Sequence, residues 1–381
     1  MTLRMALWGV LGLIVLFALA AGGWILSLPA APVASAAPAI PSGEAQAVLD
    51  ALKPPKRERP VVAILGINDA TETTDYLMPY GILRRADVAE VVALATGPGP
   101  VALFPALKVE PDATTAEFDT RYPDGADYLI VPAMSRDDDP AALDFIRAQA
   151  AKGAIVIGVC AGAKVVGAAG LLDKRKGTTH WYYLKQLRGL SPTMDYVPDR
   201  RLVVDGRVVT TTGITASMPM SLTLIEAIAS RDKAEATASE LGLESWDARH
   251  DSSAFTFTRP FALTAIGNSA TFWGRETFGI PLQAGIDEVA LALVADAWSR
   301  TYRSRALTFA ATPEAVVTRA GLRILPDRVQ AEWPAATRLP AITARPAQAL
   351  TATLDAISGR YGARTSDFVA MQLEYPKTAA R

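Results

Sequence analysis

The most constraining stretch of this chain is an apolar run that ends at its only cysteine. Residues 155–159 read as a short buried strand, Cys160 follows at once, and Ala161 with Gly162 opens a helix-like segment. A strand that turns sharply into a helix holds the turn residue at the carboxyl edge of a sheet, beside unpaired helix amides. That environment lowers a thiol pKa and can stabilise an oxyanion. A lone cysteine is otherwise core packing, so a reactive site and a core position both remain open.

Composition limits the chemistry. The 381 residues suffice for two domains, and 50% hydrophobic content provides an ample core. The 38 basic residues almost balance the 39 acidic ones, so no nucleic-acid partner is indicated. One cysteine excludes an intramolecular disulfide, and two histidines argue against a structural zinc site. We therefore expect chemistry without a metal or other cofactor.

The N-terminal segment predicts a membrane anchor. Met5 to Leu28 is a run of 24 residues without a charge, longer than the ~20 needed to span a bilayer. Arg4 precedes it and no basic residue follows until Lys53, which favours a single-pass orientation with the remainder outside the cytoplasm, in the periplasm. We assign residues 1–29 to this transmembrane anchor.

A signal peptide is the competing interpretation. Residues 34–36 (Ala-Ser-Ala) resemble a small-residue cleavage site, and cleavage there would give a secreted protein. The length of the apolar run favours an uncleaved anchor. Residues 30–59, rich in Ala and Pro and then basic, are expected to be a linker.

From Val61 onward, short apolar runs alternate with segments of helical spacing. Val61 to Leu65 is typical of a buried strand, and Thr74 to Arg85 is typical of a helix. Further strands are predicted at 88–95, 128–131, 154–159, 201–204 and 208–211, helices at 140–152, 163–169, 181–187 and 217–230, and a hairpin from 101–104 and 107–109. This alternation predicts an α/β fold, a mainly parallel sheet flanked by helices. Its sites lie beyond the carboxyl strand ends, where Cys160 would be.

These residues resemble a known family. The segments 159–162 (Val-Cys-Ala-Gly), 170–173 (Gly-Leu-Leu-Asp), 178–181 (Thr-Thr-His-Trp) and 205–216 are similar to the ThiJ/PfpI (DJ) superfamily, of the flavodoxin-like, class I glutamine amidotransferase-like fold. The resemblance is greatest to the amidase-like domain of AraC-type regulators and to isonitrile hydratases. It covers about residues 60–230, and we set this domain at 60–232.

The resemblance implies three candidate catalytic residues. Cys160 would be a nucleophile on a strained elbow, and Asp75 falls where the family places an acidic residue beside that cysteine. Asp75 would share a proton or a hydrogen bond with the sulfur; alternatively it is only a first-turn carboxylate favoured by the helix dipole. His180 is the family's candidate acid/base partner, or a structural residue.

The chain departs from the family where the oxyanion hole is expected. Paired glycines are often found after the third strand, but residues 132–134 read Pro-Ala-Met. The hole would then rest mainly on the amide of Ala161, with that of Ala133 as the second candidate. The other histidine, His250, lacks the acidic context of a glutaminase triad, so that activity is not expected.

Residues 233–381 form a C-terminal α/β region. A helix, a strand and a pair of short strands are predicted within 74–109 and again within 285–325, which suggests a degenerate partial repeat that has no cysteine. Residues 346–358 predict a further helix that Gly359 ends. The aromatic stretch 251–278 is expected to be interdomain core rather than a ligand cage.

Two functions of different class remain open. One is a membrane-tethered cysteine hydrolase or hydratase of a small electrophile such as an amide, isonitrile or aldehyde, in which Cys160 attacks, Asp75 relays a proton and the Ala161 amide holds the developing charge. The other is a non-catalytic small-molecule or redox sensor with a degenerate site. No basic recognition helix is present, which argues against a transcription factor. The resemblance also implies a possible homodimer.

Overall fold

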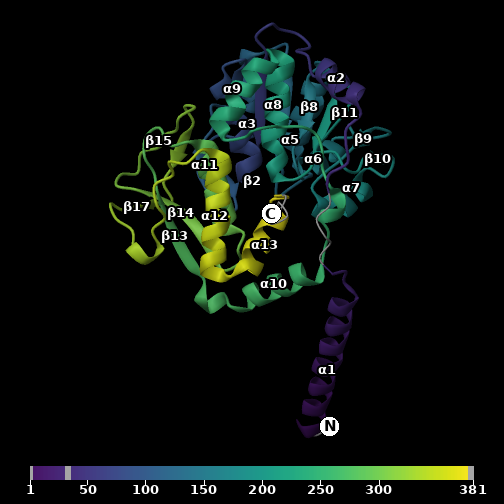
Figure 1. Ribbon diagram of the computed structural model, residues 1–381, viewed down its shortest axis with the longest axis vertical. Helices are drawn as coiled ribbons and strands as arrows, with labels where there is room; N and C mark the ends of the chain where they lie inside the picture. The colour runs from purple at the N-terminus through teal and green to yellow at the C-terminus, as the bar shows by residue number, and fades with distance from the viewer. Residues whose placement is uncertain (1–2, 31–35, 376–381) are drawn as a thin grey trace.

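The computed structural model describes residues 3–30 and 36–375, and it has one apolar helix projecting from an α/β body (Figure 1). Helix α1 (Leu3–Ser27) is long and apolar enough to cross a membrane, and a signal sequence near the N-terminus would pass the same test. The α1 end that meets the body is its C-terminal end. Residues 34 and 35 of the predicted cleavage site lie outside the described residues.

A seven-stranded sheet forms the centre of the body. Its order is β11 (Leu202–Asp205), β12 (Val208–Thr211), β8 (Ile155–Gly158), β7 (Tyr128–Val131), β1 (Val61–Gly66), β3 (Glu90–Ala95) and β6 (Ala113–Thr114). All neighbours pair in parallel except β11 and β12. All six residues of β1 are buried, which is why this strand reads as one continuous apolar run. The predicted mainly parallel sheet is confirmed.

Helices cover both faces of this sheet. Val62 and Ile64 of β1 pack into one core with α3 (Thr73–Ala86) and α8 (Ser217–Ile228). The alternate residues of the same strand pack into a second core with α5 (Pro140–Ala151) and α6 (Gly162–Ala168). This alternation follows from the two-residue period of a strand. Because α6 follows β8 directly along the chain, Cys160 lies at the carboxyl end of β8.

The predicted linker is in part a packed segment. Residues 42–51 form α2 (Ser42–Ala51), and the following Leu52 is buried. The Tyr128 hydroxyl donates to the Leu52 carbonyl oxygen at 2.6 Å, and an Arg57 guanidinium nitrogen lies 2.6 Å from a carboxylate oxygen of Asp127. Residues 42–60 are therefore fixed on the body instead of forming a free tether.

The C-terminal half adds a second, smaller layer of strands and helices. A three-stranded parallel sheet runs β13 (Glu276–Pro281), β14 (Ser304–Ala310) and β17 (Arg328–Val329), with α11 (Glu288–Ser299) packed on α3. A five-stranded sheet runs β15 (Val316–Val317), β16 (Arg323–Leu325), β5 (Lys108–Glu110), β4 (Val101–Phe104) and β2 (Asp69–Glu72). The predicted hairpin is its β4–β5 pair.

The remaining elements surround these sheets. They are α4 (Thr115–Arg121), α7 (Leu184–Leu190), α9 (Arg231–Leu241), α10 (Arg259–Ala270), α12 (Pro346–Tyr361), α13 (Ala363–Gln372), β9 (Lys176–Gly177), β10 (Asp195–Tyr196) and the 3₁₀ turns η1 (Trp181–Tyr183), η2 (Ile214–Ala216), η3 (Ser252–Ala254), η4 (Phe272–Gly274) and η5 (Ala335–Thr337). Gly359 does not end α12, which continues to Tyr361 and stops at Gly362, where φ is +88°. The segment predicted as a helix at 181–187 is η1 followed by α7.

Three strands of the second half pair in the same order as three strands of the central sheet. The parallel pairs β1–β3 and β3–β6 correspond to β13–β14 and β14–β17. An aspartate recurs at the same place: Asp112 accepts a hydrogen bond from the Ala93 amide, and Asp327 accepts one from the Thr308 amide, both at 2.8 Å. The two hairpins meet through the antiparallel pairing of β5 with β16.

The turn after Cys160 depends on the absence of a side chain at Gly162. A Cβ atom there would lie 2.0 Å from the Val131 carbonyl oxygen and 2.8 Å from the Pro132 carbonyl carbon. Backbone atoms cannot move aside as the end of a side chain can. The close approach of α6 to the end of β7 therefore requires glycine.

We predict that Gly162→Ala destabilises the protein while Gly189→Ala does not. Overpacking at Gly162 is expected to cost about 1–3 kcal/mol, whereas a Cβ at Gly189 in α7 meets nothing within 4 Å. Removing a glycine from that helix interior would be neutral or stabilising by up to about 1 kcal/mol. Thermal unfolding of the detergent-solubilised full chain measures both. Equal midpoints for the two variants would contradict the packing argument.

Candidate active site around Cys160

Cys160 occupies a strained backbone position between β8 and α6. Its φ is +56°, in the left-handed region that non-glycine residues rarely adopt. Two threonines hold this conformation. The Cys160 amide donates to Thr211 Oγ1 at 3.1 Å, and the Thr179 hydroxyl donates to the Cys160 carbonyl oxygen at 2.9 Å. The structure thus has the sharp strand-to-helix turn predicted from the sequence.

The Cys160 thiol is buried among acidic groups. Only 4% of the residue is exposed, and burial is the largest cause of a thiol pKa well above its ordinary value. Asp75, Glu72 and Glu374 raise the pKa further, and a hydrogen bond from the Ala161 amide lowers it. The direction is opposite to the one predicted from the turn alone. One amide at the start of a seven-residue helix does not offset burial and three nearby carboxyls.

Asp75 is fully buried in the first turn of α3. Its Oδ2 accepts a hydrogen bond from the Ala133 amide at 3.1 Å, while Oδ1 is buried and bonds to no described residue. Burial, followed by the proximity of Glu72, raises the Asp75 pKa well above its usual range. The carboxyl therefore holds its proton to higher pH than an ordinary aspartate does. The Ala133 amide, the second candidate for an oxyanion hole, is occupied by Asp75.

A single guanidinium pairs with two of the acids around the site. Arg300 Nη2 lies 2.7 Å from Glu72 Oε1, and Arg300 Nε lies 2.7 Å from Asp296 Oδ2. Glu72 also caps α3 by accepting the Asp75 amide at 2.6 Å. Burial raises the pKa of Glu72 to about 7 and raises that of Asp296 as well. One cation cannot balance three carboxylates, so this cluster retains protons.

The sequence interpretation missed Glu72, Asp296 and Arg300. Arg300 is 228 positions from Glu72 in the chain, so no local pattern joins them. One signal was present: Asp296 interrupts an otherwise apolar helix, and Arg300 follows it by four residues, the spacing of a helical ion pair.

His180 lies beside the site with both ring nitrogens engaged. Nε2 is 2.9 Å from the Gln372 carbonyl oxygen, and Nδ1 accepts a hydrogen bond from the Tyr182 amide at 3.2 Å. These partners fix the neutral tautomer that carries its proton on Nε2. Burial also lowers the His180 pKa. In this arrangement neither nitrogen is directed to the cysteine.

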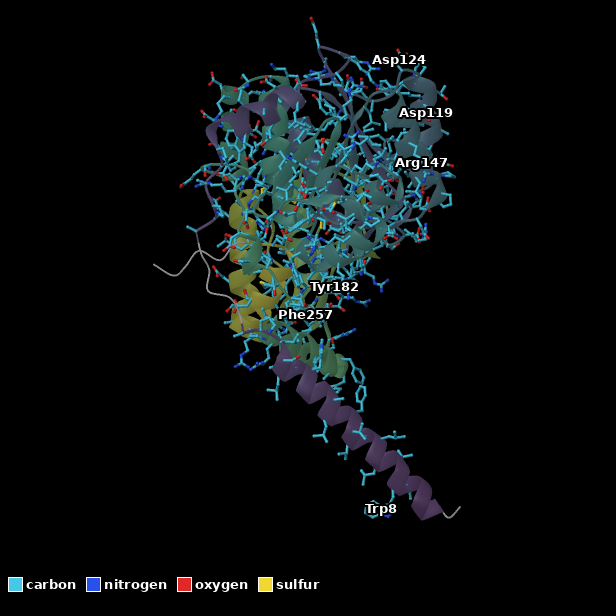
Figure 2. The ribbon with its side chains drawn as sticks, turned by 90° about the vertical axis from the view of Figure 1, so that its right-hand side faces the viewer. Trp8, Asp119, Asp124, Arg147, Tyr182 and Phe257 are labelled. Atoms are coloured by element: carbon cyan, nitrogen blue, oxygen red, sulfur yellow. The ribbon has the colours of Figure 1, made fainter. Side chains whose placement is uncertain are left out.

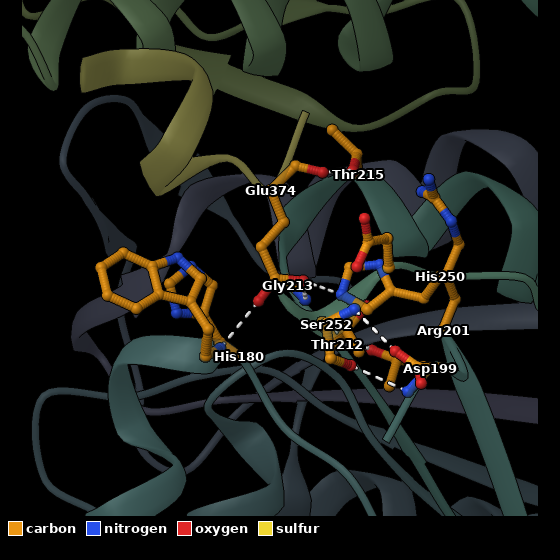
Figure 3. A network of polar contacts seen from close by, with 12 residues as sticks. His180, Asp199, Arg201, Thr212, Gly213, Thr215, His250, Ser252 and Glu374 are labelled. Atoms are coloured by element: carbon orange, nitrogen blue, oxygen red, sulfur yellow. Dashed lines mark hydrogen bonds and ion pairs between the residues drawn. The ribbon is translucent and has the colours of Figure 1, made fainter. Parts of the chain in front are cut away.

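The C-terminal segment is attached to the site through Glu374 (Figure 3). The Glu374 carboxylate accepts hydrogen bonds from the Trp181 and Gly213 amides, each at 2.7 Å, and its carbonyl oxygen accepts one from Thr215 Oγ1 at 2.7 Å. His250 Nε2 lies 3.7 Å from Glu374 Oε2. His250 therefore faces an acidic residue that the sequence around it does not show, and burial lowers its pKa.

A cavity of about 340 Å³ adjoins this network. Its lining includes Thr179, Trp181, His250, Phe255 and Glu374. Within the described part of the chain, no three His, Cys, Asp or Glu side chains are arranged to hold a metal ion. The groups that the structure brings together are thus a thiol, a carboxyl of raised pKa and backbone amides, which suit proton transfer and addition to a small electrophile.

Comparison with known proteins identifies the domain that carries this site. Residues 61–227 match the DJ-1/PfpI family. An isonitrile hydratase of Pseudomonas putida is 35% identical over 166 residues, 42% of this chain and 69% of that protein. The protein dj-1beta of Drosophila melanogaster is 22% identical over 184 residues, 47% of this chain and 95% of that protein.

The solved structure of a ThiJ/PfpI family protein from Pseudomonas syringae is 23% identical with a TM-score of 0.44, covering 50% of this chain and 77% of that one. The assignment to a family rests on two findings: the match of residues 61–227, and the 35% identity over 69% of the P. putida relative. This chain belongs to the DJ-1/PfpI family.

Proposed function

We propose that this protein is a cysteine-dependent hydratase or hydrolase of a small uncharged electrophile, with Cys160 as nucleophile and Asp75 as proton carrier. The observation that carries the proposal is the pairing of a thiol on a strained turn with a buried carboxyl of raised pKa, whose Oδ1 has no hydrogen bond to the described residues. Similarity to an isonitrile hydratase supports an isonitrile as the first substrate class to test.

The chemistry needs only water as co-reactant. With an isonitrile, the Cys160 sulfur bonds to the terminal carbon, and the thiol proton passes through Asp75 to that carbon, which gives a thioimidate. Water then adds to the same carbon while the nitrogen gains a proton. The carbon–sulfur bond breaks, the sulfur regains its proton, and a formamide leaves. The Ala161 amide, which donates to the sulfur, holds negative charge as it develops there.

In this scheme His180 positions the site and transfers no proton. Its nitrogens bond to the backbone of Gln372 and Tyr182, so the ring joins the C-terminal segment to the site. The neighbouring Thr179 supports Cys160 directly.

Replacing Asp75 with Asn is expected to abolish turnover while making the thiol easier to ionise. Asparagine cannot carry a proton, so hydration of a short-chain alkyl isonitrile should fall about 10²–10⁴-fold. Where Asp75 is ionised it raises the pKa of Cys160, so its removal should shift iodoacetamide alkylation to lower pH only in the part of the range where the aspartate has lost its proton. Formamide formation and alkylation rates between about pH 6 and pH 10 measure the two effects.

Cys160→Ser is the control for both measurements, since it removes the nucleophile and the alkylated atom. If Asp75→Asn hydrates the isonitrile as fast as the unaltered chain, Asp75 carries no proton and its proposed role is wrong.

We further propose that residues 276–329 are a degenerate second copy of residues 61–114 and complete the site. The ion pairs between the two copies are reciprocal. Arg300 reaches Glu72, the residue that caps α3, while Arg85 Nη2 lies 2.6 Å from Asp287, the residue that caps α11. Such reciprocity is typical of two-fold related interfaces. Only the Arg300 side faces a cysteine.

Matched substitutions of the two arginines test this arrangement. Arg300→Met removes a cation that favours the Cys160 thiolate, so the thiol pKa should rise and alkylation should shift by about one pH unit or more toward high pH. Arg85→Met breaks the equivalent ion pair on the side without a cysteine, and its alkylation profile should match that of the unaltered chain. Thermal midpoints are expected to fall in both variants. Identical alkylation profiles for the two variants would show that Arg300 is only structural.

The burial of Cys160 favours a second candidate function, a non-catalytic small-molecule sensor. A thiol that is 4% exposed with a raised pKa is a poor target for oxidation, so ligand binding fits better than redox sensing. A ligand that raises the thermal midpoint and is recovered unchanged would support the sensor. Helix α11 packs on α3, so this face of α3 is not free to form a homodimer, and a homodimer would use a different face of the body.

We also propose that α1 remains attached as a single-pass anchor with the body in the periplasm. The apolar part of α1 is not buried in the body, and α1 meets the body near its C-terminal end. There the Trp24 ring lies beside that of Phe257, and Arg259 donates to the carbonyl oxygens of Leu26 and Leu28 at 2.7 and 3.2 Å. Cleavage of the segment would remove these contacts.

The anchor predicts that the full chain stays in the membrane fraction after alkaline carbonate extraction, with its mass unchanged. Recovery in the soluble fraction at a mass lacking the first ~30 residues would establish a cleaved signal peptide instead.

A further inference from the structure

We infer that α10 and the turn η4 lie on the lipid surface, so that the body contacts the bilayer through a second apolar face beside α1. The inference rests on the proposed anchor. The occupant of this face is a phospholipid surface, and the argument comes from exposure, charge and position.

The exposed side of α10 and η4 is apolar. Leu263 and Ile266 are 50% and 51% exposed, and Phe272 and Trp273 are 65% and 77% exposed. The inward side of the helix is filled by Phe261, Ala262 and Asn268. Leu263, Ile266 and Ala270 are three and four residues apart, so they share one outward face of the helix. Apolar side chains of this size grouped in water are unfavourable and mark a contact surface.

The charges around this face fit a phospholipid partner. Residues 260–274 carry no ionisable side chain, whereas Arg259 precedes them and Arg275 follows. An uncharged segment between two cations is suited to lie among acyl chains and headgroups, with the exposed Arg275 guanidinium near a phosphate.

The position of α10 follows from its contacts with the end of α1. The Arg259 amide donates to the Pro29 carbonyl oxygen at 2.9 Å, and the Arg259 side chain bonds to the last carbonyl oxygens of α1. The start of α10 is therefore fixed at the level where the apolar segment ends. Figure 1 shows α10 running across the base of the body, beside the point where α1 emerges.

Aromatic side chains gather at the same level. The ring centroids of Trp24 and Phe257 are 6.0 Å apart, and those of Phe257 and Tyr182 are 6.4 Å apart. Figure 2 shows Tyr182 and Phe257 where the body meets α1, whereas Trp8 lies near the far end of that helix. Tryptophan and tyrosine at both ends of an apolar helix are typical of membrane–water interfaces.

This face is connected to the site. Phe261, on the inward side of α10, packs edge-to-face on Trp181 with ring centroids 5.4 Å apart, and Trp181 follows His180. A lipid-seated α10 would hold the segment that contains Thr179 and His180 at a constant distance from the bilayer.

Site-specific quenching of a fluorescent label tests the inference in the full chain. In a Cys160→Ser background, single cysteines are placed at Ile266, at Val317 and at Leu13, and the labelled protein is reconstituted in anionic phospholipid nanodiscs. Val317 is the exposed control in β15, which Figure 1 shows on the opposite side of the body from α1. Leu13 reports on the anchor itself.

A lipid-attached spin label should quench the dye at Ile266 and at Leu13, and aqueous iodide should quench only the dye at Val317. If the dye at Leu13 is quenched by lipid while that at Ile266 is quenched by iodide like Val317, the anchor stands and the inference is wrong. Iodide quenching at Leu13 removes the anchor and the inference together. Protection of Ile266 that depends on protein concentration, without lipid quenching, assigns this face to a second copy of the chain and also overturns the inference.

Discussion

The site depends on one buried guanidinium among three carboxyls. Burying charge is costly, and an ion pair recovers that cost only where partners and hydrogen bonds satisfy it. Arg300 pairs with Glu72 and Asp296, so Asp75 is left without a cation of its own. The free energy of the cluster is therefore lowest when Asp75 keeps its proton, which agrees with its raised pKa. A neutral acid beside a thiol can give a proton to sulfur or substrate without repelling the thiolate.

The cluster also joins the two halves of the protein energetically. Arg300 and Asp296 come from the C-terminal half, whereas Glu72, Asp75 and Cys160 come from the half that matches the family. Removing one partner of a buried ion pair is more costly than never forming it, because the other charge is left unpaired. A C-terminal half without a cysteine can thus control the ionisation of a site it does not contain.

The parts of the site that could be predicted from sequence are those set by local structure. The position of Cys160 follows from an apolar strand and a small-residue turn, whereas Asp75 was indicated only by the resemblance to the family. The hydrogen bond from the Ala133 amide to Asp75 could not be predicted, because it depends on the orientation of a side chain from another element. The ion pair of Arg300 with Glu72 and the raised pKa of Cys160 could not be predicted either, since both depend on segments that are distant in sequence.

The same limit applies to the fold. The parallel sheet and its helices follow from alternating apolar runs, whereas a partial repeat in the second half stays a prediction. The packing of residues 42–60 was not visible, because an Ala- and Pro-rich composition is typical of linkers. Their docking depends on single contacts such as that of Arg57 with Asp127, which composition does not encode.

The segment that follows α13 and contains Glu374 bears differently on the two proposed functions. Glu374 is buried and accepts two backbone amides, and hydrogen bonds to a charged group contribute about 1.5–3 kcal/mol each. Opening a segment held by a few such bonds costs less than unfolding a domain, and loops of this kind open on the microsecond-to-millisecond timescale. A hydratase needs water and substrate to reach Cys160 in every cycle, although the residue is only 4% exposed. A sensor needs only the closed arrangement to change in stability when a ligand binds. The Glu374 contacts therefore tie the segment after α13 to Trp181 and Gly213, which lie beside the residues that hold Cys160.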